Sequence, residues 1–247
     1  MIYFLYEISG MITYPRNGFP RYGVDRFMEG VAREVAPGAF LLDAGAGHRP
    51  YRALLYHTDY QSCDFLPVLE EVGGDTGIDH TFYCDLENIP KADTTYNVII
   101  CNQVLEHMKR PGQAIAEFYR VLKPGGQLYV TVPQCFGVHM SPYNYFNFLD
   151  GGLRFLFEEA GFRVVSIEPM GGIFWLLGKV TEKAYGCLLT CVRPSFWGLF
   201  LPFHLFVRLL LGIFFFILFH LDRLDRERGW TLGYGCRCVK PVPEDGA

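Results

Sequence analysis

The sequence predicts an α/β fold, in which a mostly parallel sheet carries helices on both faces. Short apolar runs of strand length alternate with amphipathic stretches of helical spacing from Ala39 to about Met170, at the intervals of βαβ units. Several of these runs end in a carboxylate or an amide, and sheets of this kind bind ligands at the carboxyl ends of their strands. At 247 residues, the chain is long enough for one large domain of this class.

Six apolar runs have the length and composition of buried strands. In chain order they read AFLLDA, YQSCDF, TFYCDL, YNVIIC, QLYVTVP and RVVSIEPM. The first closes on Asp43 and a glycine turn, the second on Asp64 and the third on Asp85. Asn97 begins the fourth and Asn102 lies just past its end. The sequence therefore predicts a ligand outside these strand ends.

Four stretches with apolar residues at helical spacing accompany these runs. They cover Tyr22–Val35, Tyr51–Tyr56, Gly112–Leu122 and Gly151–Phe162. A Pro-Gly pair follows the first, KPGG follows the third, and a glycine closes the fourth. Because glycine and proline commonly terminate helices, these positions mark the expected helix ends.

Composition excludes several classes of function. The net charge is −4 and no long basic run precedes the C-terminal region, so nucleic acid is not an expected partner. The eight cysteines are scattered, and several fall in predicted buried strands, which favours reduced thiols and a cytoplasmic protein. Cys187 with Cys191, and Cys236 with Cys238, lack the second pair of a zinc site, so no metal is predicted. The apolar N-terminus lacks the basic region and cleavage site of a secretory signal.

The glycine turn after the first predicted strand is typical of nucleotide-type cofactor sites. Gly45 and Gly47 permit positive φ angles and close approach of a ligand to backbone N–H groups, although such turns also occur for packing reasons alone. Asp64, 21 residues after Asp43, stands where a carboxylate accepts hydrogen bonds from both hydroxyls of a ribose. An NAD-binding domain would share these features, but Pro50 occupies the third glycine position of its GxGxxG motif.

Five stretches resemble successive motifs of one enzyme family. They read LLDAGAGHRPYRALL, CDF, CDLENIP, YNVIICNQVLEHMKRPGQAIAEFYRVLKPGGQLYVTVP and GLRFLFEEAGFRV, between about Ala39 and Glu168. In this order they are similar to the class I S-adenosylmethionine-dependent methyltransferases, and most of all to the type 11 group. The resemblance implies S-adenosylmethionine as the cofactor and a Rossmann-like sheet of seven strands. In that fold the last strand is antiparallel, and Trp230 to Pro241 has the alternation for it.

The resemblance also implies which residues bind the cofactor. They are Asp43, Gly45, Gly47, Asp64, Asp85, Leu86, Asn102 and Gln103. Asp43, Gly45 and Gly47 would form the turn beneath the methionine part of the cofactor. Asp64 would hold the ribose, and Asp85 with Leu86 would hold the adenine. Asn102 and Gln103 would lie near the methyl group. A strand-end cap is the alternative role for Asn102. Asn97 stands where the family often has an acid, at a position that usually serves the fold.

Two histidines are candidates for the acceptor side, where a base is needed only if the acceptor must lose a proton first. His139 lies in the aromatic loop VPQCFGVHMSPYNYF, and His107 belongs to the motif LEH, where a purely structural role is the alternative. The loop resembles an H-x-x-P-x-D-Y-x-R-Y-T segment of methyltransferases encoded with bacterial surface-polysaccharide and lipid pathways. Asn144, Asn147 and Leu149 replace its Asp, Arg and Thr, which favours a more apolar acceptor.

The segment FWGLFLPFHLFVRLLLGIFFFILFHL is apolar enough for a membrane span, yet it contains Pro202 and Arg208. It lies within residues 171–229, between the sixth and seventh expected strands, so the chain must return to the side it left and a single crossing is excluded. We therefore expect helices near 173–191 and 196–220 that lie in one leaflet, with Arg208 reaching the headgroups. A soluble helical cap and a homodimer interface are the alternatives.

These observations divide the chain into four parts. Residues 1–36 form an N-terminal helical segment, 37–170 the cofactor-binding core, 171–229 the hydrophobic insertion, and 230–247 the final strand and tail. The predicted function is methyl transfer from S-adenosylmethionine to a small, lipid-soluble or lipid-linked acceptor. The protein is expected to be cytoplasmic and attached peripherally or monotopically to the membrane surface. A membrane-anchored binding module without activity and an NAD-dependent oxidoreductase are the other hypotheses.

Overall fold

The computed structural model of the protein describes residues 18–65, 78–190 and 197–243. Residues 1–17 of the expected N-terminal segment, and Cys191, lie outside this range. The chain falls into two compact units. One comprises residues 24–168 and 233–247, and the other residues 1–23 and 169–232. Each unit is described by itself.

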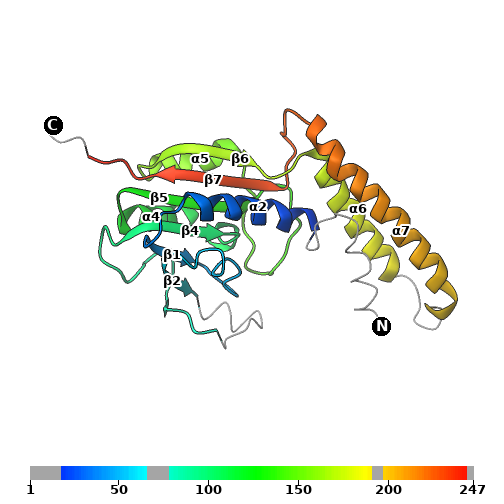
Figure 1. Ribbon diagram of the computed structural model, residues 1–247, viewed down its shortest axis with the longest axis horizontal. Helices are drawn as coiled ribbons and strands as arrows, with labels where there is room; N and C mark the ends of the chain where they lie inside the picture. The colour runs from blue at the N-terminus through cyan, green and yellow to red at the C-terminus, as the bar shows by residue number, and fades with distance from the viewer. Residues whose placement is uncertain (1–17, 66–77, 191–196, 244–247) are drawn as a thin grey trace. The chain divides into compact units, whose positions relative to one another are not determined.

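A seven-stranded sheet forms the centre of the first unit (Figure 1). Its strands are β1 (Phe40–Ala44), β2 (Asp59–Asp64), β3 (Phe82–Tyr83), β4 (Tyr96–Asn102), β5 (Leu122–Pro133), β6 (Arg163–Pro169) and β7 (Gly233–Val239). They lie side by side in the order β3-β2-β1-β4-β5-β7-β6. The pairs β1–β2, β2–β3, β1–β4 and β4–β5 are parallel, and β7 runs antiparallel to β5. The predicted mostly parallel sheet with an antiparallel last strand is confirmed.

The central strands β1 and β4 are covered on both faces. Leu41 and Leu42 of β1, and Ile99 and Ile100 of β4, have no solvent-exposed surface. Strands buried on both faces need apolar residues at nearly every position. The sequences of β1 and β4 therefore read as nearly unbroken apolar runs, without alternating polar residues.

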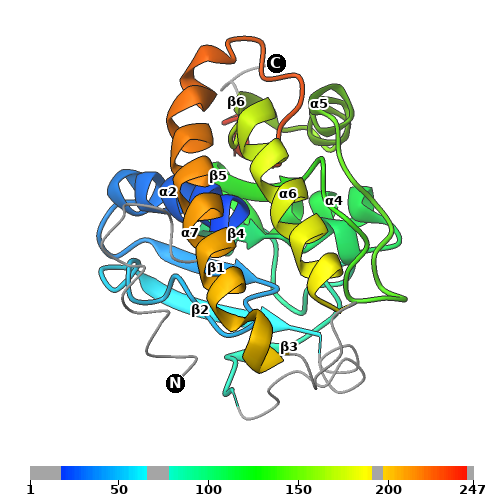
Figure 2. The same ribbon diagram turned by 90° about the vertical axis from the view of Figure 1, so that its right-hand side faces the viewer.

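Helices α2 (Gly18–Glu34), α4 (Pro111–Val121) and α5 (Asp150–Glu159) cover the two faces of the sheet (Figures 1 and 2). Since side chains alternate between the faces of a strand, neighbours on β5 point to opposite helices. Leu128 and Val130 join the core cluster that contains the buried faces of α4 and α5. Tyr129 instead packs edge to face on Phe27 of α2, with ring centroids 6.5 Å apart. The helices expected near 22–35, 112–122 and 151–162 are confirmed.

Three details differ from the sequence-based expectation. Residues 51–56 form consecutive turns and no helix, because so short a stretch gains too few hydrogen bonds to stabilise one. The KPGG segment, expected as a turn after α4, is part of β5, which already begins at Leu122. The third strand ends at Tyr83, so Asp85 lies in the turn beyond it.

A helical hairpin dominates the second unit. Helix α6 (Ile173–Thr190) and helix α7 (Trp197–Leu221) lie side by side, and the short 3-10 turn η4 (Asp222–Leu224) follows them (Figures 1 and 2). The rings of Phe19, Trp175 and Phe219 stack on one another, with Trp175 5.7 Å from Phe19 and 5.3 Å from Phe219 between centroids. The predicted pair of helices before the last strand is confirmed.

Acidic side chains join the two ends of the hairpin. Asp222 is buried, and both of its carboxylate oxygens lie 3.0 Å from the backbone nitrogen of Gly172. One of them also accepts the N–H of Trp175 at 3.1 Å, and Asp225 accepts that of Ile173 at 2.8 Å. The first turn of α6 is thus capped by residues that follow α7. The insertion therefore begins and ends at one place, as the out-and-back topology requires.

Helix α7 carries a broad apolar surface. Within the described residues, Phe203–Leu224 is long and apolar enough to cross a membrane, and only 11% of its most apolar window is buried. Length and composition alone do not separate a membrane span from a helix that lies on a surface. Among the side chains of α7 that are described, from Phe203 onward, the exposed apolar ones are Phe203, Leu205, Phe206, Leu209, Leu210, Ile213, Phe214 and Ile217.

Candidate functional site

The turn after β1 brings backbone N–H groups to the carboxyl edge of the sheet. Gly45 and Gly47 have φ angles of +70° and +49°, in the left-handed region that favours glycine. A Cβ at Gly45 would stand 2.5 Å from Cγ2 of Val104, whereas a Cβ at Gly47 would meet no atom of the described residues within 4 Å. The first glycine therefore serves close packing, and the second leaves space for a ligand.

Asp64, the last residue of β2, lies directly against this turn. Its Oδ2 accepts the N–H of Gly47 at 2.7 Å, and its Oδ1 accepts the N–H of Phe65 at 2.7 Å. These bonds fix the orientation of the carboxylate, and each oxygen keeps a second lone pair. Because the residue is only half-buried, its two oxygens can accept hydrogen bonds from neighbouring hydroxyls of a ligand.

Asp43 is buried at the end of β1 and bonded to the neighbouring strand. The hydroxyl of Tyr60 donates to its Oδ2 at 2.5 Å. Burial raises the pKa of Asp43 from 3.8 to about 7, with a further contribution from the charge of Asp64, although the Tyr60 hydrogen bond opposes the rise. Sequence reasoning missed Tyr60, because the strand register that brings these side chains together cannot be read from spacing.

The other predicted cofactor residues occupy neighbouring strand ends. Asn102 closes β4, and its Oδ1 accepts the hydroxyl proton of Thr131 at 3.1 Å. Gln103 follows with a φ angle of +54°, and its N–H donates to the Thr131 carbonyl at 2.8 Å. Asp85 is exposed in the turn after β3, and Leu86 is packed in the hydrophobic core with 5% of its surface exposed.

These residues fit the cofactor that the family resemblance implies. The open side of Gly47 admits a ligand, and the fixed Asp64 carboxylate can accept hydrogen bonds from hydroxyls. Nδ2 of Asn102 is buried and lacks a hydrogen-bond partner among the described residues, so it can donate to a ligand. A ribose linked to a polar amino-acid moiety would satisfy all three groups.

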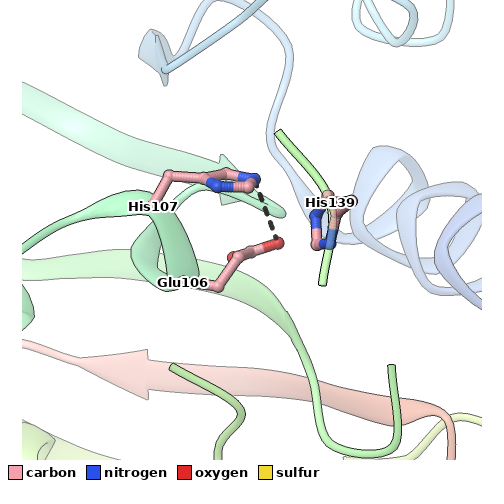
Figure 3. A group of neighbouring side chains, drawn as sticks. All are labelled: Glu106, His107 and His139. Carbon is pink, nitrogen blue, oxygen red and sulfur yellow. Dashed lines mark ion pairs between the residues drawn. The ribbon is translucent and has the colours of Figure 1, made fainter. Parts of the chain in front are cut away.

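A second group of side chains gathers after β4 and β5 (Figure 3). Glu106 and His107 belong to the 3-10 turn η2 (Leu105–His107), and His139 lies in the loop after β5. Nε2 of His107 is 3.9 Å from Oε1 of Glu106. The rings of His107 and His139 meet edge to face, with centroids 4.9 Å apart. The structure thus brings the two predicted histidines together and adds an acid to them.

Glu106 is a candidate site residue that sequence reasoning missed. It is fully buried, and neither carboxylate oxygen has a hydrogen-bond partner among the described residues. Burial raises the pKa of Glu106 to about 8. Burial also lowers the pKa of His107, although its contact with the Tyr143 carbonyl opposes this. The one signal in the sequence was the position of Glu106 beside His107 in the motif LEH.

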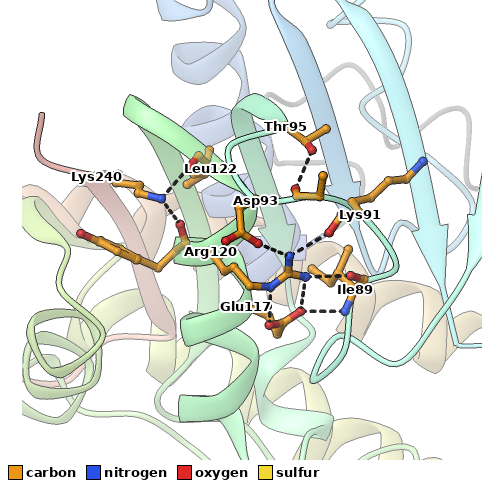
Figure 4. Close-up of polar contacts among 10 residues, drawn as sticks. Ile89, Lys91, Asp93, Thr95, Glu117, Arg120, Leu122 and Lys240 are labelled. Atoms are coloured by element: carbon orange, nitrogen blue, oxygen red, sulfur yellow. Dashed lines mark hydrogen bonds and ion pairs between the residues drawn. The ribbon is translucent and has the colours of Figure 1, made fainter.

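A separate polar network lies at the amino ends of β4 and β5 (Figure 4). Arg120 of α4 makes five hydrogen bonds of 2.7 to 2.8 Å to the side chains of Glu117 and Asp93 and to the carbonyls of Ile89 and Lys91. All five N–H donors of a guanidinium are thereby used. The network ties the loop before β4 to α4 and serves the fold.

Comparisons with known proteins agree with this geometry. Residues 42–130 match a family model described as a methyltransferase domain. The ubiquinone/menaquinone biosynthesis C-methyltransferase of Desulfotalea psychrophila is 34% identical over 107 residues, which are 39% of this chain and 43% of that protein. A probable S-adenosylmethionine-dependent methyltransferase of Mycolicibacterium smegmatis is 30% identical over 96 residues, 36% of each chain. The chain thus spans less than half the length of the curated relatives it matches.

Among solved structures, that of the cyclase SpnF is similar, with a TM-score of 0.52, 22% identity, and coverage of 88% of this chain and 81% of that one. At this identity the likeness concerns the fold alone, since one fold supports several chemistries. The family match is more specific, because it extends from β1 into β5 and includes the glycine turn and Asp64. Residues 42–130 therefore match a methyltransferase domain, and over this range the chain is similar to S-adenosylmethionine-dependent methyltransferases.

Proposed function

We propose that this protein is an S-adenosylmethionine-dependent methyltransferase that acts on a small, lipid-soluble or lipid-linked acceptor at a membrane surface. The observation that carries the cofactor assignment is the contact of Gly47 with Asp64, which sets an oriented carboxylate beside an open glycine turn. The names of the curated relatives, which are methyltransferases, support the reaction class.

The cofactor, when bound, supplies a methyl group that a sulfonium activates for displacement. The residues of this chain would then have to align that methyl group with the acceptor, and alignment alone can contribute about 7–11 kcal/mol. Asp64 would fix the ribose, Asp85 the adenine, and Asn102 with Gln103 the methionine end. In this proposal Asp43 and Gly45 hold the turn in shape from within the fold.

The cofactor assignment is tested by ligand-induced stabilisation of the full chain. S-adenosylmethionine and its demethylated product should each raise the melting temperature, because a ligand that binds only the folded state stabilises it. NAD and NADH, at equal concentrations, should leave it unchanged. A shift with the nicotinamide cofactors alone would favour the oxidoreductase hypothesis.

The loop after β5 is proposed to form the acceptor side. Its exposed side chains include Val138, Met140, Tyr145 and Phe146, which offer apolar surface to an acceptor. Asn147, which stands where related loops have an arginine, donates its Nδ2 to the Phe136 carbonyl at 3.0 Å and braces the loop. An amide in this role recognises no charge, which supports an acceptor without an anionic group at this position.

His139 and His107 are proposed to act at the acceptor. The Nδ1 atoms of both rings face backbone carbonyls, those of Gly137 and Tyr143, so each ring keeps one nitrogen for chemistry. A His139→Gln variant should lose turnover while keeping its affinity for the demethylated cofactor. Undiminished turnover on the true acceptor would remove His139 from the proposed site.

Membrane attachment is proposed from the second unit. The outward side chains of α7 are apolar over most of its length, and Leu177, Val180 and Leu188 of α6 are also exposed. Arg208 is exposed as well, and a long cationic side chain on an apolar helix can extend to phosphate headgroups while the apolar residues enter the leaflet. This supports an interfacial hairpin over a single crossing.

Vesicle binding tests this attachment. The protein should sediment with vesicles of anionic phospholipid, and a Leu209→Glu, Leu210→Glu variant should remain in the supernatant. Val165→Glu, which changes an equally exposed apolar residue of β6, is the matched control and should still bind. Failure of the wild-type chain to bind, together with a dimer that the double variant dissociates, would assign the apolar surface to a second copy.

A further inference from the structure

The group of Glu106, His107 and His139 has the composition and spacing of a metal-binding site (Figure 3). One potential ligand atom from each residue lies within 4.8 Å of the other two. Ligands at about 2.0–2.2 Å from one ion are roughly 3–3.5 Å from each other. Binding of one ion would therefore have to draw these atoms closer together than 4.8 Å. In the sequence only the adjacency of Glu106 and His107 in the motif LEH points to this group, because His139 lies far along the chain from both.

Glu106 provides an independent reason to expect a cation here. Its carboxyl group is fully buried, and neither oxygen has a hydrogen-bond partner among the described residues. A buried carboxylate without a partner is costly, and a protonated one still leaves its O–H and its carbonyl unmatched. A bound cation would interact with both oxygens of Glu106 at once, and it would favour the ionised carboxylate over the protonated acid.

The two imidazoles are oriented as metal ligands commonly are. Nδ1 of His107 contacts the carbonyl oxygen of Tyr143, and Nδ1 of His139 lies 3.1 Å from that of Gly137. A carbonyl can only accept, so each Nδ1 carries the proton and each Nε2 keeps its lone pair. Histidines that bind metals through Nε2 usually donate Nδ1–H to a carbonyl or carboxylate in this way.

We propose that Glu106, His107 and His139 bind one divalent first-row transition-metal ion and leave coordination positions open to an oxygen atom of the acceptor. Two imidazoles with one carboxylate suit zinc, iron and related ions better than calcium or magnesium, which prefer oxygen ligands alone. His139 is only half-buried, so the ion has a path to solvent on that side.

The role of the ion in catalysis rests on the proposed methyl transfer. An acceptor hydroxyl bound to the ion would become more acidic and release its proton to water. The resulting oxygen would attack the methyl carbon, forming an O–C bond, while the C–S bond breaks and its electron pair goes to sulfur. The histidines would then be ligands and not bases.

Metal binding is tested on the full chain, without an affinity tag and after treatment with a chelator. Titration with Zn²⁺ in a calorimeter should give one site per chain, and Co²⁺ should produce a saturable visible absorption band. Glu106→Gln and His139→Gln should each weaken binding by more than about tenfold, since even residues that only orient metal ligands contribute about 10- to 100-fold. His57→Gln is the matched control, because His57 is also half-buried with a ring nitrogen facing a backbone carbonyl, that of Val35.

Two outcomes would overturn the proposal: absence of stoichiometric binding in the wild-type chain, or equal binding in the wild type and His139→Gln. His139→Gln decides the matter if Glu106→Gln fails to fold. Binding of the demethylated cofactor is measured in the same samples. Cofactor binding without metal binding rejects only the metal site, whereas metal binding without cofactor binding rejects the proposed function.

Discussion

The buried carboxylate of Asp222 accepts the backbone N–H of Gly172, with both oxygens at 3.0 Å, although the two residues are 50 positions apart. This contact closes the hydrophobic insertion at its base. It holds the start of α6 against the end of α7, so the two apolar helices leave and rejoin the chain at one place between β6 and β7.

Removal of this cap should loosen the start of α6. Asp222→Ala leaves the N–H groups of Gly172 and Trp175 unpaired, and loss of an N-cap acceptor costs about 1 kcal/mol, with about 1–3 kcal/mol more for a buried unpaired group. Amide hydrogen exchange in residues 172–176 should therefore accelerate, while exchange in β4 and β5 stays slow. Glu227→Gln, an exposed acid nearby, should change neither. Unchanged exchange in Asp222→Ala would contradict the capping role.

Asp64→Ala should weaken binding of the demethylated cofactor by about 10- to 100-fold or more. Each hydrogen bond to a charged group contributes about 1.5–3 kcal/mol, and 1.4 kcal/mol corresponds to a factor of ten. Calorimetry measures the dissociation constant directly. Asp59→Ala, at the exposed opposite end of the same strand, is the control and should bind like the wild type. Equal affinities for the two variants would remove Asp64 from the cofactor site.

The two glycines of the β1 turn should respond differently to alanine. Gly45→Ala places a methyl group against Val104 in a left-handed conformation and should destabilise the fold by about 2 kcal/mol or more. Gly47→Ala meets no atom of the residues that the structure describes and should cost about 1 kcal/mol. Its methyl group, however, enters the space assigned to the ligand, so cofactor affinity should fall by about tenfold or more. Wild-type affinity in folded Gly47→Ala would show that the ligand lies elsewhere.

Asp43 should make the protein less stable as pH rises from about 4 to 7. Its pKa is about 7 in the folded state, against 3.8 ordinarily, so between these values the folded chain holds a proton that the unfolded chain has lost. The contribution of Asp43 to the free energy of unfolding is therefore complete below pH 4. It declines by up to about 4 kcal/mol as pH rises from about 4 to 7. Asp43→Asn, which keeps an oxygen for the Tyr60 hydroxyl, removes the titration. The denaturation midpoints of the wild type and of Asp43→Asn are measured at pH 5 and at pH 7.5. Between these pH values the midpoint of the variant should rise relative to that of the wild type. The same difference between the two proteins at both pH values would contradict the assignment.

Much of the fold could be predicted from the sequence because its signals are local. The run of Phe40–Ala44 is apolar except at Asp43 because β1 is buried on both faces, and the positions of Asp43 and Asp64 follow from where their strands end. The turns at 51–56 were mistaken for a helix because their spacing is helical, but the segment is too short to form one.

The acceptor side was less predictable because it depends on contacts between distant loops. Glu106 has the sequence context of a polar loop residue, and its burial arises from packing in the fold, where Tyr145 and Phe146 donate their N–H groups to its carbonyl. Tyr60 reaches Asp43 only through the pairing of β2 with β1. Such contacts are set by register and tertiary packing, which spacing along a single chain does not reveal.

The most direct test of the proposed function follows a labelled methyl group. The full chain is incubated with methyl-labelled S-adenosylmethionine and, in separate reactions, with a membrane lipid extract and a soluble extract of the same cells. Label should enter an organic-extractable product from the lipid extract, and Asp64→Ala should strongly reduce this transfer. Label that appears only in the soluble reaction would contradict the lipid acceptor, and no transfer to either extract despite tight cofactor binding would contradict the methyltransferase itself.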